Sequence, residues 1–328
     1  MSKSFGLLGF LAMTLALAWL SLSYGSVSTG WRTVALAFTA FDGSAEHLIV
    51  RNARLPRALV AAAVGGALAV SGAMLQTITR NPLASPSIFG VNAGSALFII
   101  VGIALFDITS LTQFVWFAFL GAALAAGAAY ALGSAGAGGA SPLKITLAGA
   151  ATTAFCASIT QGVMLVNGRT FDQIVFWLVG SVAGREMHML LPVVPFMALG
   201  WIVALAASSP LNALALGEDV ARGLGLRVGL LKIACAAAVV LLAGSSVAVA
   251  GPIAFVGIVV PHVARFLVGN DHRWLLPYCA VLGAALLLAA DVGARAIAMP
   301  NEVPVGIVTA LIGVPFFIWV ARRGGYAT

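Results

Sequence analysis

Ten apolar runs, separated by short polar segments, make up most of this sequence. The runs lie at about 5–24, 56–78, 92–106, 113–133, 145–167, 189–207, 229–249, 253–268, 274–298 and 305–321. Most approach the roughly 20 residues that a helix needs to cross the hydrocarbon core of a bilayer. We therefore predict an all-α polytopic membrane protein with about ten transmembrane helices.

The polar connectors leave no room for a soluble domain, so we expect residues 1–328 to form a single transmembrane domain. The first run could be a cleaved signal peptide, but no A-x-A-like site follows it, which favours a retained helix. We expect 25–53 to be a polar loop. Within the connector 168–188, the stretch FDQIVFWLVG is too short to cross and is predicted to be re-entrant or interfacial.

The composition supports a membrane protein and excludes other classes. Hydrophobic residues make up 61% of the chain and charged residues 8%, with a mean hydropathy of +1.07. A soluble domain carries about 25% charged residues, so this chain could not cover a water-facing surface. The net charge of +7 is scattered between apolar runs rather than clustered, which argues against nucleic-acid binding.

Ten crossings place both termini on the same side of the membrane. With Lys3 inside, ten of the 17 lysines and arginines fall on the cytoplasmic side, a weak bias that favours cytoplasmic N and C termini. The excess on the outer side is concentrated at Arg51, Arg54 and Arg57.

These three arginines recur every three residues, a spacing that predicts one shared face of a helix or turn. An arginine fork matches carboxylates, so the patch could dock an acidic protein face. The alternative is that the side chains extend to lipid phosphates. We expect Arg54 and Arg57, which flank Pro56, to have some access to water.

The segment at about 211–226 contains LGEDVARGLG between two predicted spans. Glu218 and Asp219 suit the first turn of a short helix, and Gly223 and Gly225 would end it. Such a helix at the membrane surface could bind a cytoplasmic partner. An ordinary amphipathic loop is the alternative.

Small polar residues form a stripe on the fifth run. Thr146, Gly149, Thr153 and Thr160 have offsets of 3, 7 and 14, which place them on one side of a helix. They could line a translocation path, but such residues also promote close helix packing in membranes.

Asp291 is a carboxylate within the ninth run, and an intramembrane charge suggests function. It could relay protons. Arg295 lies one helical turn later, however, and a structural ion pair between the two is favoured.

No other chemistry stands out. Cys156, Cys235 and Cys279 lie in apolar runs without C-x-x-C spacing, and His262 is far in sequence from other histidines, so we expect no metal site. The sequence contains no G-x-x-x-x-G-K-[ST] motif, so any ATP would be hydrolysed by another polypeptide. We expect this chain to bind no cofactor, with ATP and Mg²⁺ used by a partner.

Several stretches, in order, resemble the FecCD family of iron–siderophore, haem and vitamin B12 ABC importer permeases. They are RLPRALVAAAVGGALAVSGAMLQ (54–76), RNPLASPSIFGVNAG (80–94), LGEDVARGLGL (216–226), GPIAFVGIVVPHVAR (251–265) and EVPVGIVTALIGVPFFIW (302–319). The resemblance covers about residues 50–323 and implies a vitamin B12 permease-like fold, that of type II ABC importers.

The resemblance also implies partners and roles. The importer in the bacterial inner (cytoplasmic) membrane would be completed by a second permease subunit, which forms a homodimer or is a close paralogue. Two ATPase subunits and a periplasmic or lipoprotein substrate-binding protein would be the other partners. Arg54, Arg57 and Arg295 would then dock the binding protein. Contacts with the ATPase would come from Gly217, Glu218, Asp219 and Arg222.

The cargo stays open at this level. The resemblance favours a ferric siderophore, with haem or cobalamin as alternatives in the same family. A secondary transporter that uses Asp291 as a proton relay is the alternative from another class.

Overall fold

The computed structural model describes residues 3–25, 27, 29–135, 142–166, 174, 177–297 and 301–324, and the regular elements of this part are all helices. In chain order they are α1 (Lys3–Ser23), α2 (Trp31–Thr39), α3 (Ala45–Ile49), η1 (Val50–Arg54), α4 (Leu55–Thr79), η2 (Pro86–Phe89), α5 (Val91–Phe106), α6 (Leu111–Ser134), α7 (Pro142–Val166), α9 (Met187–Leu190), η3 (Leu191–Val193), α10 (Val194–Ala206), α11 (Ser208–Ala215), α12 (Glu218–Gly223), α13 (Val228–Ala250), α14 (Val256–Val268), α15 (His272–Ile297) and α16 (Val305–Gly324).

Each of the ten apolar runs forms helix, which confirms the all-α polytopic prediction. Seven helical segments of the described chain are long and apolar enough to cross a membrane, and α5, α14 and α16 supply three shorter apolar helices. The run at 189–207 is built from α9, η3 and α10 in succession. Of the predicted re-entrant or interfacial helix at 171–180, residues 174 and 177–180 are described and the other half lies outside the described residues.

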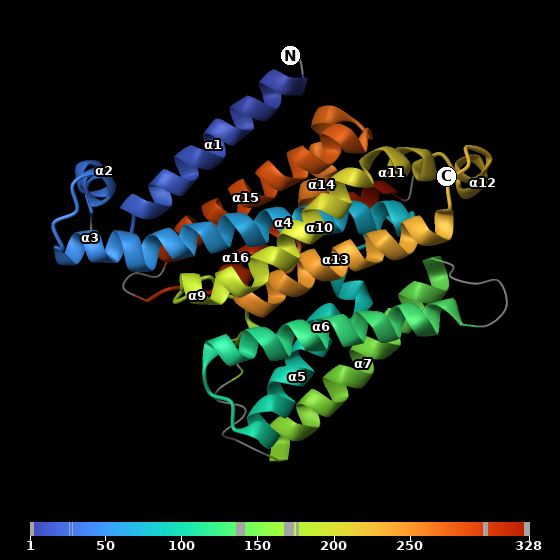
Figure 1. Cartoon of the computed structure of the whole chain (residues 1–328), viewed down its shortest axis with the longest axis horizontal. Helices are drawn as coiled ribbons and strands as arrows, with labels where there is room; N and C mark the ends of the chain where they lie inside the picture. Colours follow the sequence, from blue (N-terminus) through green and yellow to red (C-terminus); the bar gives the residue numbers. More distant parts are fainter. Residues whose placement is uncertain are drawn as a thin grey trace.

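Helix α4 runs through the middle of the bundle (Figure 1) and packs against α13, α14 and α15. Helices α5, α6 and α7 pack on one another along one edge, and α1 packs against α15 at the opposite edge. Most of α4 is therefore buried, and Met74 and Leu75 are fully enclosed.

Glycines allow α4 to approach its neighbours closely. A Cβ atom at Gly65 or Gly283 would collide with the carbonyl oxygen of the other residue, across the contact between α4 and α15. Gly72 meets Gly257 of α14 in the same way. Close backbone contact is a major source of attraction between helices in lipid, because hydrocarbon tails are as apolar as the side chains.

The prediction of a polar loop at 25–53 is wrong in part, because α2 and α3 form there and α3 continues through η1 into α4. η1 is a π-helical turn in which the Leu55 N–H bonds to the Val50 carbonyl. Pro56 follows directly and has no N–H to donate. The second apolar run is predicted to begin at Pro56. A proline is tolerated in the first turn of a helix, however, and here the helical structure already begins upstream of it, at Ala45.

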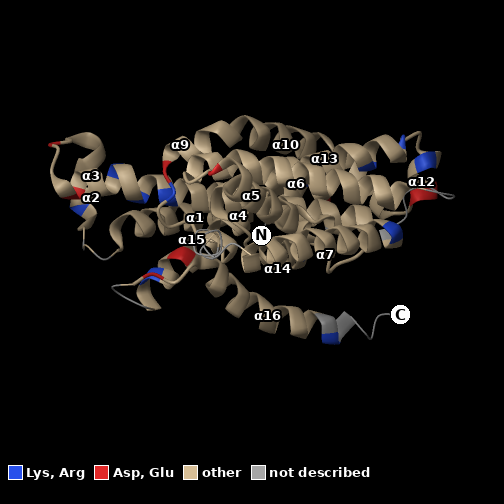
Figure 2. Cartoon of the chain, turned by 90° about the horizontal axis from the view of Figure 1, so that it is seen from below, with Lys and Arg blue, Asp and Glu red and all other residues tan. Residues whose placement is uncertain are grey.

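Charged residues gather toward the two ends of the long helices, and the middle is almost uncharged (Figure 2). We call these the arginine end, which contains Arg54, Arg57 and Arg295, and the α12 end. Helix α1 begins beside α15 on the α12 side, where Tyr278 Oη donates to the Lys3 carbonyl at 2.7 Å. Helix α16 also runs toward the α12 end (Figure 2). The described parts of both termini therefore lie on one side, as ten crossings require.

Candidate functional site

The arginine end is organised around Asp291, whose side chain is 1% exposed. Arg57 donates to both carboxylate oxygens, with Nε at 3.0 and 3.1 Å and Nη2 at 2.8 Å. Its Nη1 also donates to Glu302 Oε2 at 2.7 Å, nearer the surface. Arg57 therefore connects a buried carboxylate to a partly exposed one.

Arg295 binds the same carboxylate from the other side. Its Nη2 donates to Asp291 Oδ2 at 2.9 Å and to Ser21 Oγ at 2.6 Å. Its Nη1 donates to the carbonyls of Ser21 and Tyr24, at 3.0 and 2.5 Å. The predicted ion pair between Asp291 and Arg295 is confirmed, and Arg295 is buried by the end of α1.

Arg54 is also buried, with 6% of its surface exposed, so the expected access to water is wrong for this residue. Its Nη1 donates to the Leu22 carbonyl at 2.8 Å and to Thr29 Oγ1 at 2.5 Å, and its Nη2 donates to the Val27 carbonyl. Arg54 thus caps the Leu22 carbonyl at the end of α1, where a cation is electrostatically favourable, and also binds the segment that follows.

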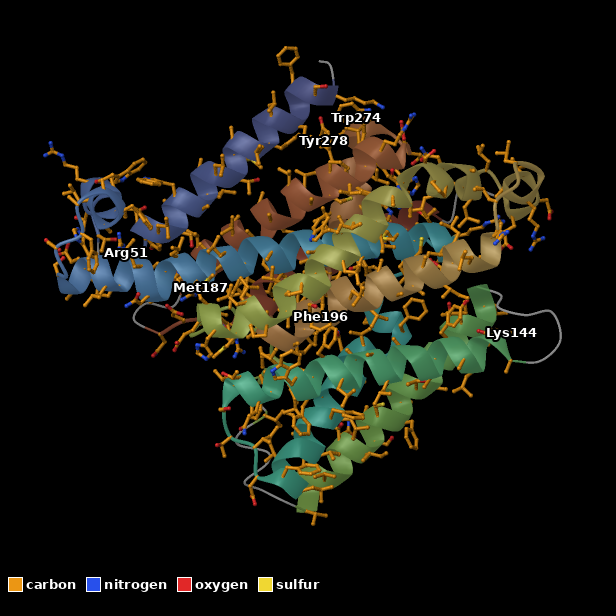
Figure 3. The ribbon with its side chains drawn as sticks, viewed as in Figure 1. Arg51, Lys144, Met187, Phe196, Trp274 and Tyr278 are labelled. Atoms are coloured by element: carbon orange, nitrogen blue, oxygen red, sulfur yellow. The ribbon has the colours of Figure 1, made fainter. Side chains whose placement is uncertain are left out.

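The spacing of the three arginines does not give one shared face. Arg51 donates through Nε to the Ala37 carbonyl of α2 at 2.6 Å, and its guanidinium lies 4.3 Å from the ring centre of Phe41 (Figure 3). Arg54 binds the end of α1 and Arg57 binds α15. The wide π-turn between Arg51 and Arg54 breaks the α-helical register.

A half-open cavity of about 340 Å³ lies between these elements. Its wall includes Arg54, Arg57, Arg185, Arg295, Glu186 and Glu302. Arg185 was not singled out from the sequence. With a cytoplasmic N terminus, however, the connector 168–188 follows the fifth crossing and lies on the outer side, where the positive-inside rule makes an arginine unexpected.

Arg185 is 7% exposed and donates through Nε to the Ser181 carbonyl at 3.2 Å. No carboxylate among the described residues pairs with it. Burial without a counter-charge lowers the pKa of the Arg185 guanidinium to about 10, which leaves it charged at neutral pH.

At the opposite end, the charged segment forms the short helix α12, as predicted. Gly217 precedes it with φ 133°, and Gly225 follows it with φ 81°, backbone conformations that L side chains rarely adopt. Arg222 pairs with Glu218 and Asp219, each at 3.2 Å.

Lys232 anchors α12 to α13. Its side chain is 9% exposed, and Nζ lies 2.6 Å from Glu218 Oε1. The hydrogen bond from Lys232 lowers the pKa of the Glu218 carboxyl, with help from the charge of Arg222. Sequence reasoning missed this contact because Lys232 lies 14 residues away, on the next helix.

A second polar cluster joins α11, α15 and α4 at this end. Asn212 Nδ2 donates to Asp271 Oδ1 at 2.7 Å, and its Oδ1 accepts from the backbone N–H of His272 at 2.8 Å. The ring of His272 reaches Thr77 Oγ1 at 2.7 Å. The expected coupling segment, 211–226, is therefore fastened to the core at two points, Asn212 and Glu218.

The small polar stripe on α7 lies on a helix that packs closely on its neighbours. Helix α7 packs against α5, α6 and η2. Gly149 is buried, and Thr153 lies near Gly90, which follows η2. Thr160 is 6% exposed, and its Oγ1 has no hydrogen-bond partner among the described atoms. Thr146 is half-buried. A role for these residues in translocation stays a prediction.

Within the described residues, no three His, Cys, Asp or Glu side chains are grouped to hold a metal ion. His262 is held by neighbouring residues. Its Nδ1 lies 3.1 Å from the Ile258 carbonyl, and its ring packs edge-on against Phe316. The three cysteines are free and buried, so they behave as small apolar side chains.

Apolar helices with charged ends define a multi-pass membrane protein. The chain belongs to the FecCD transport family, which matches residues 13–323. It is 53% identical over 304 residues to the "Probable siderophore transport system permease protein YfiZ" of Bacillus subtilis, covering 93% of this chain and 91% of that protein. It is 42% identical to the ferric enterobactin transport system permease protein FepD of Escherichia coli, covering 96% and 94%.

The fold is similar to that of a solved metal-chelate type ABC transporter in an inward-facing conformation. The TM-score is 0.84 at 31% identity, and the match covers 98% of this chain and 100% of the other. The resemblance seen in the sequence motifs is therefore confirmed at the level of family and fold.

Proposed function

We propose that this chain is the permease subunit of an ATP-driven importer that moves a ferric siderophore across the bacterial cytoplasmic membrane. The observation that carries the proposal is the 53% identity to a siderophore permease over nearly the whole of both chains. Haem and cobalamin stay as alternative cargoes within the family.

The arginine end faces outward in this proposal and the α12 end faces the cytoplasm. A substrate-binding protein docks at the arginine end through Arg54, Arg57 and Arg295. Arg57 is the most available of the three, because its contact with Glu302 lies near the surface and can be exchanged for a carboxylate of the partner.

Two ATPase subunits bind the α12 end of a pair of permease subunits, in contact with Gly217, Glu218, Asp219 and Arg222. Asp219 is 99% exposed and Arg222 is 61% exposed, so both are free to meet a partner. The ATPases hydrolyse ATP with Mg²⁺, and this chain binds no cofactor.

Transport follows from two arrangements of the permease pair. ATP binding and docking favour different arrangements, and their differential binding energy shifts the population between them. We place Thr146, Gly149, Thr153 and Thr160 along the path, where weakly polar side chains let a bulky chelate pass without holding it.

Uptake by the reconstituted complex tests the proposal. Proteoliposomes containing the permease, its ATPase and its binding protein are loaded with ATP and offered labelled ferric siderophores, ferric citrate, haem and cobalamin. We expect ATP-dependent uptake of a ferric siderophore, and none with an ATPase whose P-loop lysine is changed to alanine. Uptake that persists without ATP, or that is restricted to haem or cobalamin, would contradict it.

A further inference from the structure

The cavity at the arginine end contains more positive than negative charge. Its wall carries four arginines and two glutamates, and the buried Asp291 adds a third carboxylate next to it. Asp291 and Glu302 are engaged by Arg57 and Arg295. Glu186 is 63% exposed and lies 3.2 Å from His188. The excess is one positive charge, and the two arginines of the wall without an ion pair among the described residues are Arg54 and Arg185.

These two arginines differ in how many of their side-chain nitrogens donate a hydrogen bond. The terminal nitrogens of Arg54 donate to three oxygens at residues 22–29. Arg185 has one hydrogen bond within the described chain, from Nε to Ser181, which leaves both terminal nitrogens without an acceptor there. Neither nitrogen is among the unpartnered side-chain atoms sealed from solvent, and Arg185 is part of the cavity wall.

The backbone around Arg185 is firmly held. Ser181 N–H donates to the Ala250 carbonyl at the end of α13 at 2.8 Å, and the Gly180 carbonyl accepts from the Gly306 N–H of α16 at 3.0 Å. The Ala183 N–H donates to Ser181 Oγ at 3.1 Å. The guanidinium is therefore presented by a preorganised segment, which lowers the entropic cost of binding.

We infer that Arg185 receives a carboxylate side chain that the docking partner inserts into this cavity; the inference rests on the proposed function. The two terminal nitrogens lie on one edge of the guanidinium and match the two oxygens of a carboxylate. A volume of about 340 Å³ is at the low end for small-molecule pockets and suits an inserted side chain.

With this role, Arg185 contributes more to docking than the other arginines of the arginine end. Arg54 and Arg295 are already neutralised or hydrogen-bonded inside the chain, and Arg57 must exchange a partner to bind a new one. Arg185 needs no exchange. A carboxylate that reaches it gains a charge-assisted pair without breaking an existing ion pair.

The first test measures docking to the permease in nanodiscs across a salt series, with the substrate-binding protein encoded beside the permease as the probe. We expect Arg185→Gln to weaken binding by about 30-fold, the lower end of the range for a desolvated charge pair, and to flatten the salt dependence. Arg185→Lys should recover part of the loss. Arg32→Gln, an exposed arginine on α2 and the matched control, should stay within about twofold. Wild-type affinity in a folded Arg185→Gln permease would overturn the inference.

A second measurement needs no substitution. Phenylglyoxal modifies accessible arginines, and peptide mapping reports the extent at each position. We expect Arg185 of the wild-type permease to be modified when free and protected when the binding protein is docked. Equal modification in the two states overturns the inference. Protection by anionic lipid or by citrate, without the binding protein, also overturns it and identifies the lipid or a free anion as the ligand.

The two proposals fail in different ways. If wild-type permease neither binds the delivery protein nor transports, the proposed function is wrong. If it does both, and Arg185→Gln docks normally with Arg185 unprotected in the complex, only the inference about Arg185 is wrong.

Discussion

Arg57 and Asp291 form a bidentate ion pair although they lie 234 residues apart, at the beginning of α4 and near the end of α15. Arg295 holds the same carboxylate from within α15. Asp291 thus has a cation on each side and is enclosed by protein. Asp291 therefore links the beginning of α4 to α15 through two ion pairs, a structural role that needs no proton transfer.

Asp291→Asn should destabilise the permease rather than disable proton coupling. The substitution leaves two buried arginines without their shared counter-charge, a change that typically costs about 3–5 kcal/mol. Thermal unfolding in detergent measures the loss, and Asp107→Asn, at an exposed loop position, is the control. A variant with normal stability but no uptake, together with wild-type uptake that a protonophore abolishes, would instead support the relay.

Reversing the charge of Arg57 should harm docking more than removing it. Arg57→Ala loses an attraction worth about 2 kcal/mol or less at this partly exposed position, and Arg57→Glu adds repulsion from Asp291, Glu302 and the partner's carboxylates. Affinity for the binding protein across a salt series reports the effect, with thermal stability measured beside it and Arg32→Glu as the control. Affinity and salt dependence equal to wild type would favour the lipid-phosphate interpretation of the outer arginines.

Replacing Glu218 and Arg222 together by glutamine should uncouple ATP hydrolysis from transport or loosen the ATPase, with the fold intact. The double change removes the negative charge that Lys232 pairs with, which weakens the attachment of α12 to α13, and it removes the exposed cation of Arg222. Co-purification of the ATPase and the ratio of ATP hydrolysed to cargo moved are the measurements. Asp219→Asn is the control, because it removes an exposed charge from α12 and leaves the contact between Glu218 and Lys232 in place. Normal coupling in the double variant would refute a role for α12.

A methyl group at Gly283 should destabilise the contact between α4 and α15. The new Cβ would meet the Gly65 carbonyl and approach Ala69 Cβ to 2.6 Å, and overpacking of this kind costs about 1–3 kcal/mol. Gly293→Ala on the same helix has open space and should be neutral or slightly stabilising. Melting temperatures of the two variants give the comparison; equal values would mean that the helices can separate at no cost.

Single cysteines test the orientation. The native cysteines are buried, so background labelling should be low. We expect Asp42→Cys to react with an impermeant maleimide on intact cells and Asp219→Cys to react only after the membrane is opened. Both native carboxylates are exposed, at 63% and 99% of their side-chain surface. The opposite pattern would invert the proposed topology.

The order and type of the helices could be predicted from the sequence because a bilayer imposes a simple condition. Each spanning segment must be apolar and long enough to satisfy its own backbone hydrogen bonds, so ten apolar runs become helices. Helix α12 could also be predicted, because the acidic residues at its start and the glycines at its end are local signals. The Asp291–Arg295 pair could be predicted for the same reason, as the two residues lie one turn apart.

Contacts between distant segments depended on the tertiary structure. The three-residue spacing of Arg51, Arg54 and Arg57 predicts one face, but a π-turn and three different neighbours send the side chains to α2, α1 and α15. In the sequence, Lys232 is one of several cations near the end of a predicted helix, and nothing marks Glu218 as its partner. The packing of α12 on α13 brings the two side chains together. The partner of a side chain therefore depends on which segments of the chain pack beside it.

The sequence by itself determined a multi-pass helical protein of the FecCD type, because hydrophobicity and local motifs are properties of neighbouring residues. Only the tertiary structure decided which arginines are already paired. The sequence indicated no partner for Arg54 and only Asp291 for Arg295, whereas in the structure both arginines also bind the end of α1. Arg185 was not singled out from the sequence, and its two terminal nitrogens have no acceptor among the described residues. Burial and the geometry of acceptors fix that difference, and both arise when helices far apart in the chain pack together.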